Sequence, residues 1–254
     1  MEKSKQIIRH LYWYWIDPII SLRKIFQSIS LYRTFLSQWS EYNRKQNVED
    51  LHFLDSYPMI YDRTIETPFD AHYFYQAVWA TQRIIQNAPN VHLDLGSDNR
   101  YVGLLTTHLP VFFLDIRPLN ISLPNFYSIT GDVLSLPISS GSINSISSLH
   151  VVEHIGLGRY GDSLNPRGTE YACRELSRIL SPSGNLYISL PVGIQRTCFN
   201  AHRIHDPLCI YDLFPNLKLV EFSAVDDKGK LHLNTSPELL KSANHACGLY
   251  WLKK

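Results

Sequence analysis

The chain has 254 residues, of which 44% are hydrophobic and 19% are charged, and its formal net charge is +1. This length is sufficient for one large domain or two small ones around a sizeable apolar core. The composition excludes a fibrous or wholly disordered chain, and the near-zero net charge gives no support for a nucleic acid partner.

The charge is unevenly distributed along the chain. Residues 1–47 contain eight Lys and Arg against three Asp and Glu, a net charge of +5, so the remainder has a net charge of −4. An acidic remainder argues against binding to a phosphate backbone.

Cysteine usage and the N-terminal pattern bear on localisation. The four cysteines form no C-x-x-C pair, which favours reduced thiols and a cytoplasmic protein over a disulfide framework. No apolar run approaches the length of about 18 residues needed to span a bilayer. Because Asp17 and Pro18 interrupt the first apolar stretch, and no small-residue cleavage site follows, we expect no signal peptide.

Residues 5–45 predict two amphipathic helices that are separated at Asp17-Pro18, because apolar residues recur at spacings of three and four. Two interpretations of residues 1–47 stay open. The helices form a cap that packs against the following domain or a second subunit. Alternatively, their basic side chains and aromatics such as Trp13 and Trp15 make a peripheral contact with an anionic membrane surface.

The remaining pattern indicates two parts of the chain. Residues 48–70 are predicted to be irregular, and residues 72–86 predict a helix rich in aromatics. We therefore expect an N-terminal helical extension over residues 1–70 and a second domain over residues 71–254.

From residue 91 onward, strand patterns alternate with helical patterns, which predicts a mostly parallel sheet covered by helices. One helix is predicted from Gly168 to Leu180, because the Ser181-Pro-Ser-Gly184 run ends it. We expect the last strand at an edge of the sheet. The predicted strands are residues 91–95, 111–115, 126–130, 144–150, 185–190, 217–223 and 248–252.

Three acids, Asp94, Asp115 and Asp132, follow the first three predicted strands. Because the carboxyl ends of parallel strands meet at one edge of a sheet, we expect these acids to line a common crevice. Asp115 lies 19 residues after Gly96, a spacing at which an acid accepts hydrogen bonds from ribose hydroxyls. The pattern predicts a site for a nucleoside-like cofactor, and the alternative is that these acids only form turns. A nicotinamide-binding fold would need Gly-x-Gly-x-x-Gly after the first strand, which is absent.

Residues 70–254 resemble class I S-adenosylmethionine-dependent methyltransferases, because five segments occur in the order used by that superfamily. The resemblance implies a Rossmann-like α/β domain with a seven-stranded, mostly parallel sheet, and S-adenosylmethionine as the cofactor. The segments are Leu93–Ser97, Leu114–Arg117, Gly131–Pro137, Leu149–His154 and Glu175–Pro191.

Two segments, Glu153–Asp162 and Phe199–Arg203, resemble a bacterial and nematode family of unknown function with a methyltransferase-like fold. This narrower resemblance implies a connection to polysaccharide biosynthesis.

The superfamily resemblance also implies cofactor-binding roles for individual residues. The first-strand acid and the glycine loop after it approach the methionine part of the cofactor, and the second acid binds the ribose. The third acid and the residue after it lie near the adenine amine, and the end of the fourth strand lies beside the sulfonium. The residues at these positions are Asp94, Gly96, Ser97, Asp115, Asp132, Val133 and Leu149.

The chain departs from the superfamily at the glycine loop. Where Gly-x-Gly-x-Gly is usual, this sequence has Gly96-Ser-Asp98-Asn-Arg100. The Asp98 side chain either obstructs the close approach of the backbone to the cofactor, which glycine permits, or binds the amino group of the cofactor.

Candidate catalytic residues follow the fourth predicted strand, where the sequence places His150, Glu153 and His154 beside the expected methyl group. A hydroxyl acceptor benefits from a general base, and histidine is suited to this role near neutral pH. We expect His154 to act as the base and Glu153 to orient it or to bind substrate. The alternative is that Glu153 and His154 only hold the loop through backbone hydrogen bonds.

The same residues permit two metal-dependent alternatives. The run from His150 to His154 matches the H-x-x-E-H pattern of inverted zinc proteases, which requires the whole run to lie on a helix. The second alternative is a divalent metal held by Glu153, His154 and either His202 or His205. We favour a site without a metal.

Two polar loops are predicted to determine substrate specificity. Arg159 and Arg167 are expected to clamp a phosphate or carboxylate, and Asn200, His202 and Arg203 are expected to reach the same mouth. The alternative is that these arginines are solvated surface groups.

These observations lead to a hypothesis and its alternative. The hypothesis is an S-adenosylmethionine-dependent methyltransferase that acts on a hydroxyl of a small molecule or glycan precursor. The alternative is a non-catalytic binding or assembly protein that retains the methyltransferase fold, which the altered glycine loop favours. A nucleic acid substrate is disfavoured by the acidic second domain, and the sequence leaves the oligomeric state open.

Overall fold

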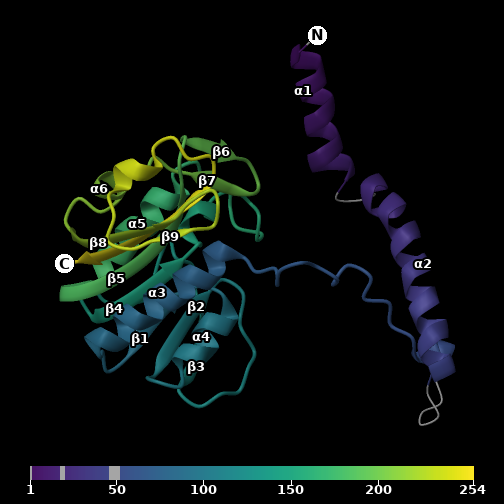
Figure 1. Cartoon of the computed structure of the whole chain (residues 1–254). Coiled ribbons are helices and arrows are strands. Elements are labelled where there is room, and N and C mark those ends of the chain that lie inside the picture. The colour runs from purple at the N-terminus through teal and green to yellow at the C-terminus, as the bar shows by residue number, and fades with distance from the viewer. Residues whose placement is uncertain (1, 18–20, 46–51) are drawn as a thin grey trace. The chain divides into compact units, whose positions relative to one another are not determined.

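The computed structural model describes residues 2–17, 21–45 and 52–254, and its contacts divide the chain into two compact units, Met1–Pro68 and Phe69–Lys254 (Figure 1). The predicted break at Pro18, and residues 48–51 of the predicted irregular segment, lie outside the described residues.

The first unit is helical. Its elements are α1 (Glu2–Leu11), the π-helical turn η1 (Tyr12–Ile16), α2 (Leu22–Lys45) and the short 3₁₀-helix η2 (Phe53–Asp55). Neither η1 nor α2 contains a buried residue, so the apolar stripe of each helix is open to solvent within this unit. Among the described residues, no helix combines the length and the apolarity that crossing a membrane requires.

The second unit is a three-layer α/β domain. Its helices are α3 (Ala71–Asn87), α4 (Asn99–Leu105), η3 (Val152–His154), α5 (Gly168–Ile179), α6 (Ile210–Leu213) and η4 (Pro237–Leu240). Its strands are β1 (His92–Leu95), β2 (Val111–Asp115), β3 (Phe126–Thr130), β4 (Ile143–Leu149), β5 (Leu180–Val192), β6 (Arg196–Cys198), β7 (His202–Ile204), β8 (Lys218–Val225), β9 (Leu231–His232) and β10 (Ala246–Lys253).

In the described residues, the main sheet has the strand order β3-β2-β1-β4-β5-β10-β8-β9. The first five of these strands pair in parallel, and β10 is antiparallel to both β5 and β8. The prediction of an edge strand at the carboxyl end is therefore wrong, because β10 lies inside the sheet. Apolar residues at consecutive positions, such as Leu249 and Tyr250, bury both faces of β10, which is typical of an interior strand.

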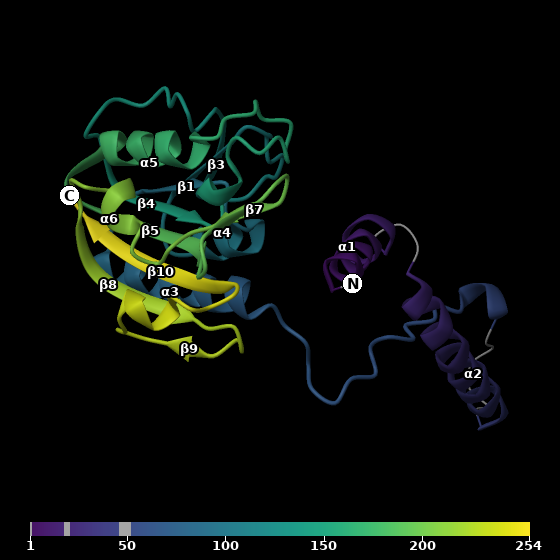
Figure 2. The ribbon, with the colours of Figure 1, turned by 90° about the horizontal axis from the view of Figure 1, so that it is seen from above.

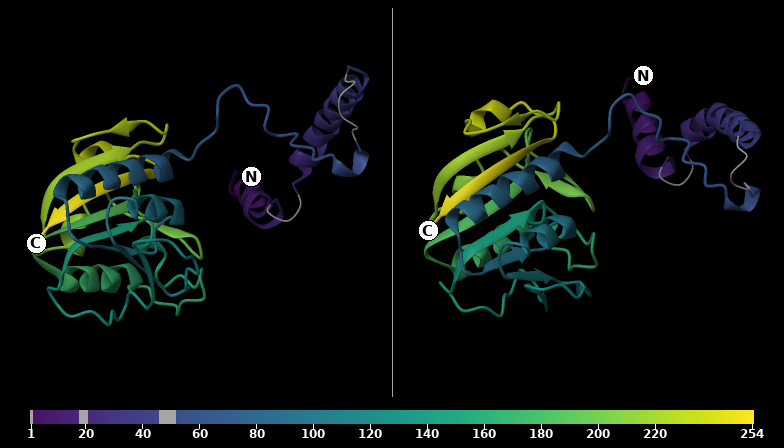
Figure 3. Two further views of the ribbon diagram at one scale, coloured as in Figure 1. Left: turned by 90° about the horizontal axis from the view of Figure 1, so that it is seen from below. Right: turned by 60° about the horizontal axis from the view of Figure 1, so that its bottom comes forward.

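Helices cover both faces of this sheet, with α3 and α4 on one face and α5 on the other (Figures 2 and 3). Alternate strand residues point to opposite faces, so the core consists of two clusters. The first contains Leu93, Leu95, Ile146, Leu176, Leu186 and Phe214. The second contains Trp79, Ile84, Val102, Val111, Phe113 and Leu249.

Helix α3 is anchored to the sheet through Glu221 of β8. The carboxylate accepts hydrogen bonds from the Trp79 indole at 2.8 Å and from the Arg83 guanidinium at 2.8 and 3.1 Å. Burial raises the pKa of Glu221, but the Arg83 and Trp79 donors more than offset this and hold the pKa below its usual range. Because the pKa of Glu221 is lower in the folded protein than in the unfolded chain, its ionised carboxylate stabilises the fold at pH values above the unfolded-state pKa. This stabilisation is lost as the pH falls through the folded-state pKa.

We expect Glu221→Gln to lower the free energy of unfolding by about 3 kcal/mol at pH 7, because the substitution leaves the nearly buried Arg83 without its counter-charge. Urea denaturation followed by circular dichroism measures this loss. Glu238→Gln, on the surface helix η4, is the matched control and should change stability by less than about 0.5 kcal/mol. Equal stabilities of the two variants would contradict the anchoring role.

Candidate active site

The carboxyl ends of β1, β2, β3 and β4 surround a cavity of about 470 Å³. This position is expected, because ligands of open parallel sheets bind beyond the strand carboxyl ends where the strand order reverses. The lining residues are Leu95, Gly96, Leu114, Asp115, Ile116, Arg117, Gly131, Asp132, Val133, Leu134, His150, Val151, His154, Ile155, Tyr160, Gly161, Asp162 and Ser163.

Two of the three predicted acids, Asp115 and Asp132, line this cavity together with Gly96. Gly96 has a φ of +63°, and an added Cβ would lie 3.2 Å from both Asp115 Oδ2 and Val151 Cγ1. Glycine is therefore favoured here both by the backbone conformation and by the close approach of the Asp115 carboxylate.

Asp94, which the sequence predicts to contact the cofactor, is not among the residues that line the cavity. It is fully buried, and its carboxylate accepts hydrogen bonds from Ser97 N at 3.0 Å, Ser97 Oγ at 2.7 Å and Ser147 Oγ at 2.5 Å. Burial raises the pKa of Asp94 to about 6, although these hydrogen bonds oppose the shift. The carboxylate holds the β1 turn that presents Gly96.

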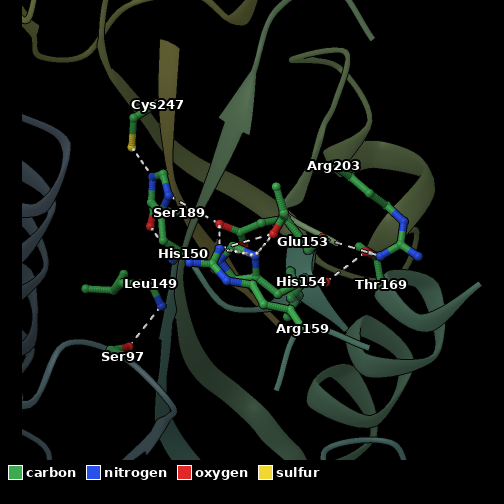
Figure 4. Close-up of polar contacts among 12 residues, drawn as sticks. Ser97, Leu149, His150, Glu153, His154, Arg159, Thr169, Ser189, Arg203 and Cys247 are labelled. Atoms are coloured by element: carbon green, nitrogen blue, oxygen red, sulfur yellow. Dashed lines mark hydrogen bonds and ion pairs between the residues drawn. The ribbon is translucent and has the colours of Figure 1, made fainter. Parts of the chain in front are cut away.

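The predicted roles of two neighbouring residues are corrected in the same way. The Ser97 hydroxyl is buried and accepts the backbone N–H of Leu149 at 3.0 Å, so it joins the ends of β1 and β4 (Figure 4). Leu149 itself packs in the core beneath α3 and α4. In its place, Val151 contributes to the cavity lining.

Asp98 is the N-cap of α4 and lies outside the cavity lining. Its carboxylate accepts the backbone N–H groups of Arg100 at 2.9 Å and Tyr101 at 3.4 Å. This is the usual role of aspartate at the start of a helix. Neither alternative from the sequence, obstruction of the cofactor or binding of its amino group, describes this geometry.

The carboxylate of Asp115 is held by the next basic residue along the chain. Arg117 donates its backbone N–H at 2.8 Å and its guanidinium at 3.3 and 3.4 Å to Asp115. The guanidinium also lies 4.3 Å from the ring centroid of Tyr160, which belongs to a glycine-rich loop, residues 156–168, that follows η3. Arg117 therefore connects the second strand to the loop on the other side of the cavity.

His150 is engaged at both ring nitrogens. Its Nδ1 lies 3.2 Å from Glu153 Oε1, and its Nε2 lies 3.1 Å from Cys247 Sγ (Figure 4). Burial alone lowers the pKa of His150, but the Cys247 and Glu153 groups outweigh burial and raise it to about 10. Both ring nitrogens of His150 therefore face protein side chains, and its role in proton abstraction stays a prediction.

Glu153 is completely buried and is not among the residues that line the cavity. Its Oε1 lies between His150 Nδ1, at 3.2 Å, and His154 Nε2, at 3.6 Å. Burial raises the pKa of Glu153, but the His150 hydrogen bond and positive charge outweigh it, so the pKa stays below its usual range.

His154 lines the cavity and is 7% exposed. Its Nδ1 lies 2.6 Å from the carbonyl oxygen of Ala201 and 3.3 Å from Arg159 Nη1. The shorter contact assigns a hydrogen bond from Nδ1–H to the carbonyl, which leaves the lone pair of the neutral ring on Nε2. Burial lowers the pKa of His154, and the Glu153 charge opposes this shift.

Arg203 is a buried scaffold residue, which corrects its predicted contact with substrate. Its guanidinium donates hydrogen bonds that join the start of the glycine-rich loop to the start of α5 (Figure 4). The acceptors are the carbonyl oxygens of Glu153, Ile155, Asn165 and Pro166 and the hydroxyl of Thr169, at 2.7 to 3.4 Å.

The other predicted substrate residues also lie outside the cavity lining. Arg167 is exposed and pairs with Glu170 at 2.7 Å, so it is a solvated surface group. Arg159 donates to the carbonyl oxygen of Ala201 at 3.1 Å, and Asn200 donates to that of Leu157 at 3.5 Å. These bonds join the two polar loops, which do meet as the sequence predicts.

The structure also bears on the metal-dependent alternatives. Only Val152–His154 is helical in the His150–His154 run, as one 3₁₀ turn, which excludes the inverted zinc protease geometry. Among the described residues, the alternative set with Glu153, His154 and His202 or His205 does not form a group of converging ligand atoms. His202 and His154 have ring centroids 6.4 Å apart.

Several residues of this region have no sequence signal that identifies them. Arg117 and Tyr160 lie inside motifs that the resemblance includes, but their contact across the cavity depends on the fold. Cys247 contacts His150 across 97 positions of the chain. Two residues so far apart in the sequence form no motif of characteristic spacing, so the sequence does not identify their contact.

Comparisons with known proteins agree with the fold. A family model described as "Caenorhabditis protein of unknown function, DUF268" matches residues 138–247, which is less than half of the chain. No curated protein matches in sequence.

Two solved structures illustrate the similarity. One chain, from a complex between the Haloferax volcanii Trm112 methyltransferase activator and a "putative methyltransferase", is 14% identical with a TM-score of 0.52, over 72% of this chain and 89% of that chain. A "putative sarcosine dimethylglycine methyltransferase" from Galdieria sulphuraria is 14% identical with a TM-score of 0.50, over 71% and 86%. The second unit therefore has a methyltransferase fold.

We expect Arg203→Lys to lower the free energy of unfolding by about 3 kcal/mol, because an ammonium group cannot replace the forked donors and leaves buried carbonyls unpaired. Arg167→Lys is the matched control and should cost less than about 0.5 kcal/mol. Urea denaturation measures both. A similar loss in the two variants would remove the scaffold role of Arg203.

Proposed function

We propose that the second unit is an S-adenosylmethionine-dependent methyltransferase that acts on a hydroxyl of a small molecule or glycan precursor. One observation carries the proposal. Two carboxylates, Asp115 and Asp132, and the turn glycine Gly96 line one cavity at the carboxyl ends of neighbouring strands, in a domain with a methyltransferase fold.

The cavity has groups suited to each part of the adenosine moiety. The Asp115 carboxylate is the acceptor for ribose hydroxyls, and Ile116 and Leu134 offer apolar contacts for the base. Asp132 is exposed and is the proposed hydrogen-bond acceptor for the amine of the base. When bound, S-adenosylmethionine supplies an electrophilic methyl group.

Ribose binding requires Asp115 to exchange its contacts with the Arg117 side chain. These contacts are 3.3 and 3.4 Å long, and the Arg117 side chain is 58% exposed. An ion pair of this exposure contributes little stability. Ribose hydroxyls therefore replace the guanidinium at small cost, while the Arg117 backbone N–H stays on the carboxylate.

His154 is the proposed general base. The Ala201 carbonyl fixes its tautomer, and the lowered pKa keeps the ring neutral near pH 7, so Nε2 is able to take a proton from the acceptor hydroxyl. The Glu153 carboxylate, 3.6 Å from Nε2, stabilises the imidazolium that forms. Proton transfer to a positioned base contributes about 10² to 10⁴ in rate.

A non-catalytic binding or assembly protein is the second candidate function. The observation that favours it is the Asp115–Arg117 pair, which occupies the proposed ribose acceptor. Titration calorimetry with S-adenosylmethionine and S-adenosylhomocysteine separates the two functions. Saturable heat supports the enzyme, whereas a folded sample that gives no heat at high micromolar ligand supports the second candidate.

We expect S-adenosylhomocysteine at 100 times its Kd to stabilise the protein by about 2.7 kcal/mol, and Asp115→Ala to abolish this stabilisation because the ribose acceptor is lost. Thermal melting with and without ligand measures the effect. Asp98→Ser preserves the helix cap and should respond as the unaltered protein does. Ligand stabilisation that persists in Asp115→Ala would refute the proposed cofactor site.

We also propose that the first helices contact an anionic membrane surface, where a lipid-linked glycan precursor would be available. Between Lys5 and Ile16 the described side chains include Trp13, 44% exposed, and Trp15, 67% exposed, together with the exposed base Arg9. Aromatic rings with nearby basic groups are typical of helices that bind at the lipid interface.

We expect the double substitution Trp13→Ser with Trp15→Ser to reduce co-sedimentation with vesicles of equimolar phosphatidylcholine and phosphatidylglycerol by about tenfold, because two interfacial anchors are removed. Tyr57→Ser removes an exposed aromatic outside these helices and is the control. Binding of the unaltered protein should weaken as salt is added. Equal pelleting of all three proteins would exclude lipid contact through these tryptophans.

A further inference from the structure

A second chemical centre lies beside the cavity. His72 near the start of α3, His150 after β4 and Cys247 on β10 come from distant parts of the chain, and their ligand atoms all lie within 4.8 Å of one another. We propose that these three side chains bind one divalent transition-metal ion of the zinc type. This inference does not depend on the proposed function.

The donor set favours such an ion. One thiolate and two imidazoles suit zinc and similar late transition metals, whereas magnesium and calcium require oxygen ligands. In a tetrahedral zinc site, Zn–N and Zn–S bonds of about 2.0 and 2.3 Å place the ligand atoms about 3.3 to 3.6 Å apart. The His150 Nε2 to Cys247 Sγ distance of 3.1 Å is close to this range.

The orientation of His150 is the strongest support. Its Nδ1 faces the buried Glu153 carboxylate at 3.2 Å, which turns Nε2 toward Cys247 (Figure 4). A metal-binding histidine almost always donates the N–H of its other ring nitrogen to a carboxylate, a carbonyl or water, and this hydrogen bond fixes the tautomer. The Glu153 carboxylate is fully buried, and its Oε1 lies nearer to the His150 ring than to the His154 ring.

The backbone also holds His150 in place. Its φ of +54° is uncommon for a residue with a side chain, and such conformations persist where the surroundings impose them. The His150 N–H donates to Ser189 Oγ at 2.9 Å and to the Ser189 carbonyl at 3.2 Å. The strained residue is thereby fixed with its ring directed at Cys247.

The three-residue set resembles catalytic more than structural zinc sites. Structural sites are closed by four protein ligands, whereas catalytic sites use three and keep the fourth position for water or substrate. His150 also lines the cavity, so the proposed ion would adjoin the ligand site. The His245 ring stacks against that of His72, with centroids 5.3 Å apart.

Cys173 provides an internal contrast. It is as fully buried as Cys247, but it packs in the apolar cluster under α5, and burial raises its pKa well above the usual value. A buried cysteine that only fills space has this kind of environment. Cys247 also packs in an apolar cluster, but unlike Cys173 it has an imidazole nitrogen 3.1 Å from its sulfur.

Cobalt titration tests the proposal on the full chain. Protein stripped with a chelator is titrated with Co²⁺ alone, and thiolate-to-cobalt charge-transfer absorption reports on the sulfur ligand. We expect one Co²⁺ per chain with this band, and displacement by Zn²⁺. Cys247→Ser should abolish the band, and His72→Gln should retain it while weakening Co²⁺ affinity about 100-fold, since one of three ligands is lost.

Two matched variants complete the test. Cys198→Ser alters a half-buried cysteine outside the cluster and should titrate as the unaltered protein does. Glu153→Gln removes the orienting carboxylate and should weaken Co²⁺ affinity by about 10- to 100-fold while the band remains. Circular dichroism of each metal-free variant establishes that it is folded; if Cys247→Ser does not fold, His72→Gln decides the result.

The proposal is overturned if the unaltered protein binds no Co²⁺ stoichiometrically, if the band persists in Cys247→Ser, or if His72→Gln binds with unchanged affinity. These outcomes are distinguishable from failure of the proposed function. Calorimetry with S-adenosylhomocysteine on the same stripped protein reports on the cofactor cavity alone.

Discussion

A carboxylate that is removed from water must be compensated by donors or positive charge, because the cost of burying it alone is prohibitive. Two such carboxylates organise the ligand-bearing edge of the sheet. Asp94 meets this requirement with the β1 turn and β4, and Glu153 meets it chiefly with the His150 ring. Each acid therefore holds a loop in place, and neither reaches the cavity itself.

The cavity depends on these supports. The turn held by Asp94 presents Gly96, whose missing Cβ leaves room for the Asp115 carboxylate. Arg203 joins both ends of the glycine-rich loop on the opposite side. Two rigid walls of this kind allow a preformed pocket, which lowers the entropic cost of binding a ligand.

His150 is common to the cofactor cavity and the proposed metal centre. One side of the residue lines the cavity, while its Nε2 faces Cys247. Glu153 orients His150 and also lies near His154, the proposed base. One buried carboxylate thus lies between the proposed base and a ligand of the proposed metal centre.

Much of the fold could be predicted from the sequence, because its signals are local. The alternation of apolar strands and helices predicts the α/β layers. Asp115 ends its strand, and Asp132 follows its strand after one glycine. The resemblance to methyltransferases adds the order of the elements. The position of a strand within the sheet is not a local property of the sequence. The apolar residues of β10 predict a strand, but pairing with both β5 and β8 decides that it lies in the interior.

The sequence by itself determined which acids follow parallel strands, since backbone periodicity and strand ends are properties of neighbouring residues. Only the tertiary structure decided which side chains face the cavity and which support it. The motif that contains Arg203 predicts a contact with substrate. In the structure, however, the five hydrogen-bond acceptors of Arg203 lie in segments 34 to 50 positions away in the sequence. Burial and hydrogen-bond satisfaction over such separations are set by packing, and packing leaves no local pattern in the chain.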